Sequence, residues 1–326
     1  MPTNPMEYIW PGIIAAQAIH AAAKLRIPDL LASGTKTIAE LASESSTHPR
    51  ALERLLNALT SIQMFARTPD GRFSNTPLTE VLRSDHPQSQ RDAALFLPSP
   101  FLWRPLGELA ESVRTGQPVF ERAFGQRFFD YLGSHPDQAA IFNASMSHGV
   151  AYTSPALLAA YDFSRFERLV DVGGGQGALI RDILSATPKL RGVLFDLPQV
   201  VSGAGEILAG EVRARCEIVG GDFFQSVPEG ADAYILKGVL HDWPDDDAVR
   251  ILQNVRAAIR PAGTLLLLEN VLDVTPKAGL MDLLMLVIAG RERAEADFRS
   301  LVGAAGFRLT RIVPLEPNAL VECHPV

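Results

Sequence analysis

The sequence predicts an α/β protein whose second half forms an open sheet, preceded by a smaller helical region. Three observations support this fold class. Residues 169–178 have the pattern of a short buried strand, a glycine turn and the start of a helix. Apolar runs typical of strands then alternate with helical stretches to the end of the chain. The last two runs are separated only by residues 314–318, which are too few for a crossover, so these strands should pair antiparallel.

Seven strands are expected in the second half, and their helices fill the gaps. The strands should lie near residues 168–172, 192–196, 216–219, 232–236, 264–270, 307–313 and 319–323. Ligands of open α/β sheets bind beyond the carboxyl ends of the strands. The glycine turn, with the first amides of the following helix, should therefore face a nucleotide-like ligand.

Size, charge and cysteine content narrow the classes of function. The 326 residues, 47% hydrophobic and 21% charged, suggest about two soluble globular domains. A formal net charge of −7 argues against a nucleic-acid partner and favours a small-molecule ligand. Cys216 and Cys323 have neither metal-ligand spacing nor a disulfide framework, which favours the reducing cytoplasm. The N-terminus lacks the pattern of a signal peptide. The apolar stretch 278–290 is too short to span a bilayer, so no membrane segment is expected.

The first part of the chain has the pattern of a winged helix. Residues 12–31 predict one or two helices whose broad apolar face could form either a subunit interface or an ordinary core. Thr37 and Glu40 form a capping box at the start of another helix. A further helix begins near Pro49, and a hairpin over residues 64–73 follows it. Two helices followed by a hairpin are typical of this motif.

A winged helix suggests DNA binding, but the charges argue against that function. The candidate recognition helix offers only Arg50 and Arg54, and Glu53 offsets Arg54. A regulator that senses a small ligand remains an alternative.

Residues 84–149 should form an interrupted helical segment that is rich in aromatic side chains. Such side chains are mostly core. Phe142 and Met146 lie four residues apart, which places them on one face of a helix. They are either core residues or part of a pocket for a planar aromatic substrate.

Polar residues follow several of the predicted strands. Asp196 closes the second strand, where an acid suits a ribose diol, and Asp222 closes the third. His241 follows the fourth strand beside Asp242 and Trp243, so it should face the same edge of the sheet as the glycine turn. A histidine there is either a structural hydrogen-bonding residue or a base. The glycine pattern also satisfies the loose dinucleotide fingerprint, which leaves a nicotinamide dehydrogenase as an alternative.

Six short motifs occur in a fixed order across the second half: DVGGGQG at 171–177, FDLP at 195–198, GDFF at 221–224, LHDW at 240–243, LE at 268–269 and GRER at 290–293. This set resembles the S-adenosylmethionine-dependent O-methyltransferases of the caffeic acid and flavonoid type. It also resembles their bacterial relatives that act on aromatic natural products.

The resemblance implies a Rossmann-like, seven-stranded methyltransferase sheet with a C-terminal antiparallel hairpin. It also implies three parts: a winged-helix-like dimerisation domain over residues 1–95, a helical linker lining the substrate pocket over 96–160, and an S-adenosylmethionine-binding catalytic domain over 161–326. The expected partners are a small aromatic hydroxyl substrate and a second copy of the chain. No nucleic acid or membrane is expected to bind.

The resemblance also assigns roles to individual residues. The cofactor S-adenosylmethionine would be bound by Asp171, Gly173 and Gly175 in the glycine loop, Asp196 at the ribose, Asp222 and Phe223 at the adenine, and Lys237 and Trp243 nearby. His241 would be the general base, oriented by Glu269 and Glu292. Phe142 and Met146 would line the acceptor pocket. No metal is required, because the chemistry needs only alignment of the acceptor oxygen with the methyl group and removal of its proton.

Alternatives to these roles come from the residues themselves. Glu269 could be a surface charge at a strand end, and Glu292 an exposed charge paired with Arg291 or Arg293. A family member that binds S-adenosylmethionine without transferring its methyl group is a further alternative, although the presence of His241 argues against it.

Three departures from the family pattern concern the acceptor side. Gly238 stands where the family commonly has a large residue, which predicts a wider pocket beside Lys237. Ala294 stands where Thr often follows the Glu-Arg pair, and the loop over residues 287–290 is shorter than in plant members. Plant substrates are therefore not implied.

Overall fold

The computed structural model describes residues 4–326, and the chain divides into two compact units, Met1–Arg104 and Pro105–Val326. Helix α7 (Pro100–Leu106) runs across this boundary. The first three residues of the predicted domain 1–95 lie outside the described residues. The predicted boundaries at residues 95 and 160 stay a prediction.

The N-terminal unit contains the two helices and the hairpin that the sequence predicts. Its elements are α1 (Met6–Lys24), α2 (Ile27–Leu30), α3 (Ile38–Glu44), α4 (Pro49–Ser61), β1 (Phe65–Arg67), β2 (Phe73–Asn75), α5 (Pro77–Glu80) and α6 (Arg91–Phe96). Thr37 accepts a hydrogen bond from the Glu40 amide at 3.2 Å, and Glu40 accepts one from the Thr37 amide at 2.6 Å, so the capping box is confirmed.

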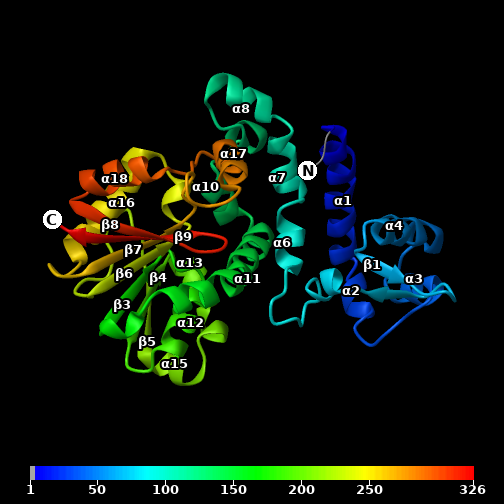
Figure 1. Ribbon diagram of the computed structural model, residues 1–326, viewed down its shortest axis with the longest axis horizontal. Helices are drawn as coiled ribbons and strands as arrows, with labels where there is room; N and C mark the ends of the chain where they lie inside the picture. Colours follow the sequence, from blue (N-terminus) through cyan, green and yellow to red (C-terminus); the bar gives the residue numbers. More distant parts are fainter. Residues whose placement is uncertain (1–3) are drawn as a thin grey trace. The chain divides into compact units, whose positions relative to one another are not determined.

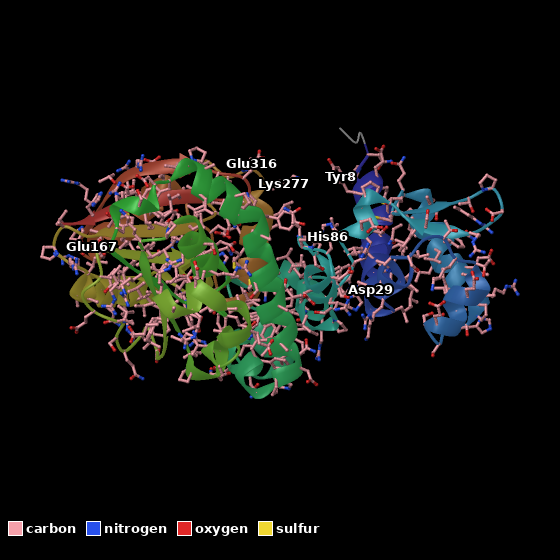
Figure 2. All side chains as sticks on the ribbon, turned by 90° about the horizontal axis from the view of Figure 1, so that it is seen from below. Tyr8, Asp29, His86, Glu167, Lys277 and Glu316 are labelled. Carbon is pink, nitrogen blue, oxygen red and sulfur yellow. The ribbon has the colours of Figure 1, made fainter. Side chains whose placement is uncertain are left out.

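Helix α1 buries small side chains and exposes large apolar ones. Ala18, Ala22 and Ala23 face the core of the unit, while Tyr8 and Trp10 on the first turns are 63% and 70% exposed. Figure 2 labels Tyr8 on this helix. Ile9, Ile13 and Ile14 are exposed by about half. Several large exposed apolar side chains on one helix are typical of an interaction surface.

The C-terminal unit begins with helices and continues as a sheet covered on both faces (Figure 1). The helices that come first are α8 (Leu109–Thr115), α9 (Phe120–Phe124), α10 (Phe128–Ser134) and α11 (Pro136–Ala160). The strands are β3 (Arg168–Val172), β4 (Arg191–Asp196), β5 (Cys216–Gly220), β6 (Ala233–Lys237), β7 (Thr264–Glu269), β8 (Phe307–Pro314) and β9 (Ala319–Pro325). The remaining elements are η1 (Phe163–Arg165), α12 (Ala178–Ala186), α13 (Pro198–Val201), α14 (Ala204–Ile207), α15 (Gly210–Arg215), η2 (Leu240–Asp242), α16 (Asp245–Ala258), α17 (Ala278–Ile288) and α18 (Glu295–Ala304).

The strands form one sheet in the order β5-β4-β3-β6-β7-β9-β8. Strands β3 to β7 are parallel, whereas β9 pairs antiparallel with both β7 and β8, as the short connection predicts. The chain leaves β3 toward β4 on one side and later returns to β6 on the other. The carboxyl ends of β3 and β6 therefore flank the point where the strand order reverses, which is where ligands bind in such sheets.

Alternating residues of the strands pack into two cores. Val170, Tyr234 and Leu236 face the layer that contains α16 and α18. Leu169 and Ile235 face the layer that contains α11 and α12. This burial on both faces explains why the parallel strands have continuous apolar sequences. Within residues 4–326, no helix combines the length and apolar character needed to cross a membrane.

Candidate active site

The loop after β3 has a backbone shape that only glycine adopts easily. Gly173, Gly175 and Gly177 have positive φ angles of 68°, 61° and 89°. A Cβ on Gly173 would lie 2.7 Å from Val239, and a Cβ on Gly174 would lie 2.7 Å from an oxygen of Asp171. At Gly175, in contrast, no atom of the described part of the chain except its chain neighbours lies within 4 Å of the Cβ position. The loop is therefore packed tightly on its inner side and open on the side where a ligand would lie.

Asp171 is a fully buried carboxylate whose two oxygens meet no donor at ordinary hydrogen-bond geometry among the described residues. Burial raises the pKa of Asp171 to about 7, and the charge of Asp196 adds to this increase, while Lys237 and the Ile180 amide oppose it. A buried carboxyl group with no donor is costly. A cationic or hydrogen-bond-donating ligand at the glycine loop would supply the missing partner.

Two further carboxylates lie at the same edge of the sheet. Asp196, at the end of β4, accepts hydrogen bonds from the amides of Gly175 at 2.8 Å and Leu197 at 2.7 Å. Burial raises the pKa of Asp196, and these two amides oppose the increase. Asp222, after β5, accepts from the Phe224 amide at 2.9 Å. Each carboxylate keeps lone pairs for the hydroxyl or amine of a nucleoside.

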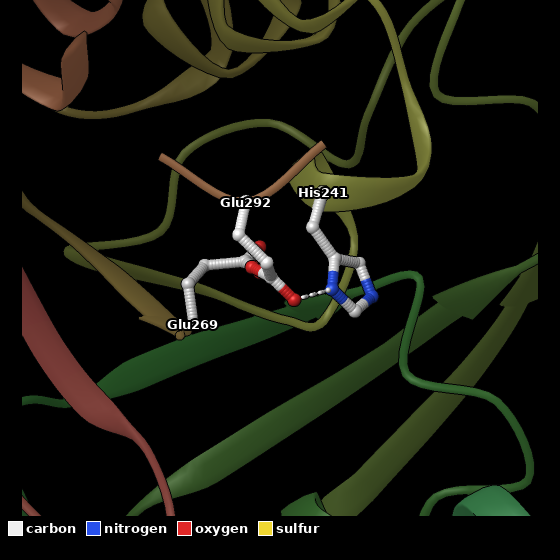
Figure 3. Close-up of side chains that lie close together, drawn as sticks. All are labelled: His241, Glu269 and Glu292. Atoms are coloured by element: carbon white, nitrogen blue, oxygen red, sulfur yellow. Dashed lines mark hydrogen bonds and ion pairs between the residues drawn. The ribbon is translucent and has the colours of Figure 1, made fainter. Parts of the chain in front are cut away.

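His241 lies in the short helix η2, directly after β6. Its Nδ1–H donates to Glu292 Oε1 at 2.9 Å (Figure 3). Its Nε2 lies 3.5 Å from Asp242 Oδ1. The histidine side chain is 19% exposed, whereas that of Glu292 is 1% exposed. The Nδ1 bond leaves Nε2 as the nitrogen that gains and loses the titrating proton.

Glu269 holds the backbone before His241 instead of bonding to its ring. The residue ends β7 and is 1% exposed, so it is not the surface charge of the alternative interpretation. Its Oε1 accepts from the amides of Val239 at 3.1 Å and Leu240 at 2.9 Å. Its Oε2 has no hydrogen-bond partner among the described residues. Burial raises the pKa of Glu269.

The charges around His241 favour its protonated form. Burial lowers the pKa of His241, but the Asp242 charge, the Glu292 hydrogen bond and the Glu269 charge outweigh burial and raise the pKa to about 10. The pKa of Asp242 rises to about 7 because that carboxyl is buried. Burial also lowers the pKa of Lys237, at the end of β6.

Arg293 and Gly290 are functional positions that the sequence interpretation did not assign. Arg293 is 1% exposed and donates to the carbonyls of Leu240 at 2.7 Å and Trp243 at 2.9 Å, on either side of His241. A Cβ on Gly290 would overlap the carbonyl oxygen of His241. The sequence feature that could have identified both residues is their position beside Glu292 in the GRER motif.

An aromatic cluster connects the cofactor side with helix α11. Trp243 stacks on Phe129 with ring centres 5.5 Å apart and contacts Phe223 edge-on at 6.1 Å. Phe129 in turn contacts Phe142 on α11, with centres 6.2 Å apart. Met146, one turn further along α11, is 43% exposed. The structure thus connects Phe142 to Trp243 through Phe129, and the acceptor-lining role of Phe142 and Met146 stays a prediction.

Comparison with known proteins adds independent findings. The sequence matches the O-methyltransferase domain over residues 106–308 and the O-methyltransferase dimerisation domain over residues 8–85. A phenazine O-methyltransferase of Lysobacter antibioticus is 40% identical over 97% of this chain and 94% of its own length. The crystal structure of LaPhzM is 38% identical and covers 100% of both chains with a TM-score of 0.95. An O-methyltransferase of neocarzinostatin biosynthesis, solved with S-adenosylmethionine and 2-hydroxy-5-methyl naphthoic acid, is 34% identical and covers 96% of each chain with a TM-score of 0.81.

Proposed function

The chain belongs to the family of S-adenosylmethionine-dependent O-methyltransferases, and from this premise we propose that it methylates a hydroxyl of a small aromatic natural-product metabolite with His241 as general base. The observation that carries the proposal is the bond between His241 and the buried Glu292, at the carboxyl end of β6. The aromatic acceptor is supported by the naphthoic acid ligand of the neocarzinostatin relative and by the aromatic cluster on α11.

The cofactor site consists of residues from three strand ends. When bound, S-adenosylmethionine supplies a methyl group that its positive sulfur has already activated. Asp171 would offer a negative charge to the cationic part of the ligand. Asp196, held by the Gly175 amide, would accept the ribose hydroxyls, and Asp222 with Phe223 would bind the adenine. Gly173, Lys237 and Trp243 complete the proposed set.

The base acts through the two nitrogens of one imidazole ring. Nε2 of His241 takes the proton of the acceptor hydroxyl while Nδ1–H stays bonded to Glu292, which stabilises the imidazolium that forms. A phenol has a pKa of about 10, and an unperturbed histidine about 6.5. The carboxylates raise the pKa of His241 to about 10, so the pKa values of the base and of a phenol acceptor become similar. Glu269 keeps the backbone of Val239 and Leu240 in place, which positions the ring.

We propose that no metal takes part. The nearest ligand-type atoms of His241, Glu269 and Glu292 lie within 4.8 Å of one another, a spacing that a cation could also use. However, Nδ1 is bonded to Glu292 Oε1, and Glu269 Oε1 is held by two amides. Full activity after dialysis against a chelator is the expected result.

We propose that two copies of the chain form a homodimer through the N-terminal unit. The match to a dimerisation domain supports this proposal, and so does the exposed apolar face of α1 around Tyr8 and Trp10. A cytoplasmic location stays a prediction from the cysteine content.

The experiment that tests the proposed function is transfer of a labelled methyl group from S-adenosylmethionine to a panel of phenols, hydroxyquinones, hydroxyphenazines and small hydroxy acids. Labelled product from a phenolic member supports the proposal. Tight cofactor binding without transfer to any acceptor would favour the non-methylating alternative.

Asp171→Asn should weaken binding of S-adenosylmethionine by about tenfold, because the amide lacks the charge that a cationic ligand would meet. Binding of the neutral 5′-methylthioadenosine should change little. Titration calorimetry with both ligands provides the comparison. Since the pKa of Asp171 is about 7, the wild-type affinity for the cationic ligand should increase as the pH rises through 7 and this carboxyl ionises. Equal losses for both ligands would show that Asp171 acts only through its shape.

Gly238→Ala should raise KM for acceptors with a substituent beside the reacting hydroxyl. Gly238 has φ +58°, and the described atoms within 4 Å of its Cβ position, apart from its chain neighbours, belong to His241, with Nε2 at 3.4 Å. The new methyl group would therefore occupy space next to the base. Gly230→Ala is a matched control, because Gly230 also has a positive φ, +80°, but its Cβ position has no atom of residues 4–326 within 4 Å apart from its chain neighbours. Unchanged KM values across a panel of substituted acceptors would contradict this assignment.

A further inference from the structure

Behind Glu292 lies a chain of side-chain hydrogen bonds that the mechanism has not used. Asn270 Nδ2 donates to Glu292 Oε1 at 2.9 Å, the same oxygen that accepts from His241. Asn318 Nδ2 donates to Asn270 Oδ1 at 3.1 Å. Thr153 Oγ1 donates to Asn318 Oδ1 at 3.3 Å. The chain thus runs from a threonine hydroxyl through two amides to the carboxylate that holds the base.

The members of this chain come from distant parts of the sequence. Asn270 directly follows β7, Asn318 directly precedes β9, and Thr153 is a buried residue of α11 with 2% exposure. Each asparagine accepts at its oxygen and donates at its nitrogen, so all the bonds point in one direction, toward Glu292. Turning Asn270 over would place its oxygen against Glu292 Oε1 and its nitrogen against the Asn318 nitrogen, and turning Asn318 over would place its oxygen against the Asn270 oxygen. The Thr153 hydroxyl can donate or accept, and it also lies 3.4 Å from the Gly149 carbonyl. The two amides therefore have one favoured arrangement.

Glu292 is held mainly at one oxygen. Its Oε1 accepts from both His241 and Asn270, whereas its Oε2 is buried and has no hydrogen-bond partner among the described residues. The Glu292 amide donates to Asp282 of α17 at 2.8 Å, which fixes the backbone but not the carboxylate. Asn270 is thus the side chain, besides His241 itself, that sets the direction of Glu292 Oε1.

We propose that Asn270 and Asn318 are positioning residues for methyl transfer. They hold Glu292 Oε1 against Nδ1 of His241 and connect this pair to α11, the helix that carries the predicted acceptor residues. The inference rests on the proposed function, because it requires His241 to be the base. The other charged groups that act on His241 are Asp242 on the same turn and Glu269 at the end of β7, and Lys237 at the end of β6 interacts with both of these carboxylates.

Asn270→Leu removes the donor at nearly the same side-chain size. Methyl transfer should fall by about tenfold to a hundredfold, the range for loss of a hydrogen bond to a charged group. The pKa of His241 should move down toward its ordinary value of about 6.5, because a carboxylate that turns away from Nδ1 stabilises the imidazolium less. Asn318→Leu, one bond further away, should cause a smaller change in the same direction.

The pKa of His241 can be measured without knowing the acceptor. Histidine-labelled enzyme with S-adenosylhomocysteine bound is titrated by NMR, and the His241 signal is identified as the one missing in His241→Asn. Asn75→Leu is the matched control. Asn75 is a half-buried asparagine in the N-terminal unit whose Nδ2 donates to the Pro28 carbonyl at 2.9 Å. This variant can lose stability but should not shift the titration of His241.

A double-variant comparison separates positioning from a general loss of stability. If Asn270 acts through Glu292, then Asn270→Leu should have little further effect on transfer or titration in a Glu292→Gln background. Additive effects of the two changes, or an unshifted His241 titration in Asn270→Leu, would overturn the proposal. Wild-type transfer by His241→Ala would instead refute the base assignment, a result distinct from either of these.

Discussion

His241→Ala should lower kcat for methyl transfer by at least about a hundredfold, while the affinity for S-adenosylmethionine stays unchanged. The structure gives the reason. Nδ1 is committed to Glu292 Oε1 at 2.9 Å, so Nε2 is the nitrogen left to take a proton, and alanine removes both. Single-turnover transfer of labelled methyl with the best acceptor of the panel measures kcat, and calorimetry measures cofactor binding.

A matched control for this variant is His324→Ala in the same unit. His324 lies in β9 and interacts with the Gly263 carbonyl and with Glu322, away from the carboxyl ends of β3 and β6. Its loss should leave kcat near the wild-type value. Undiminished transfer by His241→Ala would indicate an acceptor that is already ionised when it binds, and the base assignment would then be abandoned.

Glu292→Gln should lower kcat by about tenfold to a hundredfold and also change its dependence on pH. The glutamine oxygen can still accept the Nδ1–H bond, so the ring keeps its orientation, but the negative charge that stabilises the imidazolium is gone. The change therefore weakens the base without removing it.

The direction of the pH effect follows from the charge of the base. Only the neutral imidazole can take a proton, and the carboxylates raise the pKa of His241 to about 10. Wild-type kcat/KM should therefore increase with pH well above 7 and fall as the pH is lowered. In Glu292→Gln this increase should occur at lower pH. In the wild type, kcat should increase at a lower pH than kcat/KM does. The reason is that the sulfonium cation of the bound cofactor repels the imidazolium and so lowers the pKa of His241.

Glu269→Gln is the control for this second prediction. Its Oε1 bonds to the amides of Val239 and Leu240, and a glutamine oxygen can accept both. Because the Glu269 charge also raises the pKa of His241, the variant should shift the pH profile in the same direction as Glu292→Gln while leaving the contact at Nδ1 untouched. An unshifted profile in Glu292→Gln beside a shifted one in Glu269→Gln would show that the Glu292 charge does not act on the base.

The fold could be predicted from the sequence because its signals are local. The strand predicted at 168–172 has those same bounds, and the strand predicted at 192–196 begins one residue earlier. Apolar runs that are buried on both faces and end at glycine or aspartate define such strands clearly. The antiparallel end of the sheet followed from the length of one connection.

The site was predictable only as far as its residues occur in motifs. His241 and Glu292 were expected to lie together, and they do. Glu269 was also expected to orient the ring, but it bonds to the preceding backbone amides, and no sequence pattern distinguishes these two roles. No sequence pattern predicts the role of Asn318, because its partner Asn270 is 48 residues away in the chain. Contacts of this kind depend on how the strands are ordered in the sheet.

The contact of Gly290 with the carbonyl of His241 has a consequence for redesign of the enzyme. The Arg291 amide donates to that carbonyl at 2.8 Å, and Arg293 donates to the carbonyls of Leu240 and Trp243. These hydrogen bonds thus hold residues 290–293 and the turn over residues 240–243, which carries His241, in a fixed arrangement. Residues 272–289 are tied to residues 290–293 as well, because Asp282 accepts from the Glu292 amide at 2.8 Å and the Leu272 amide donates to the Arg293 carbonyl at 3.0 Å. When loops are grafted from relatives to change the acceptor, residues 272–293 should therefore be transferred, or retained, together with the turn that carries His241.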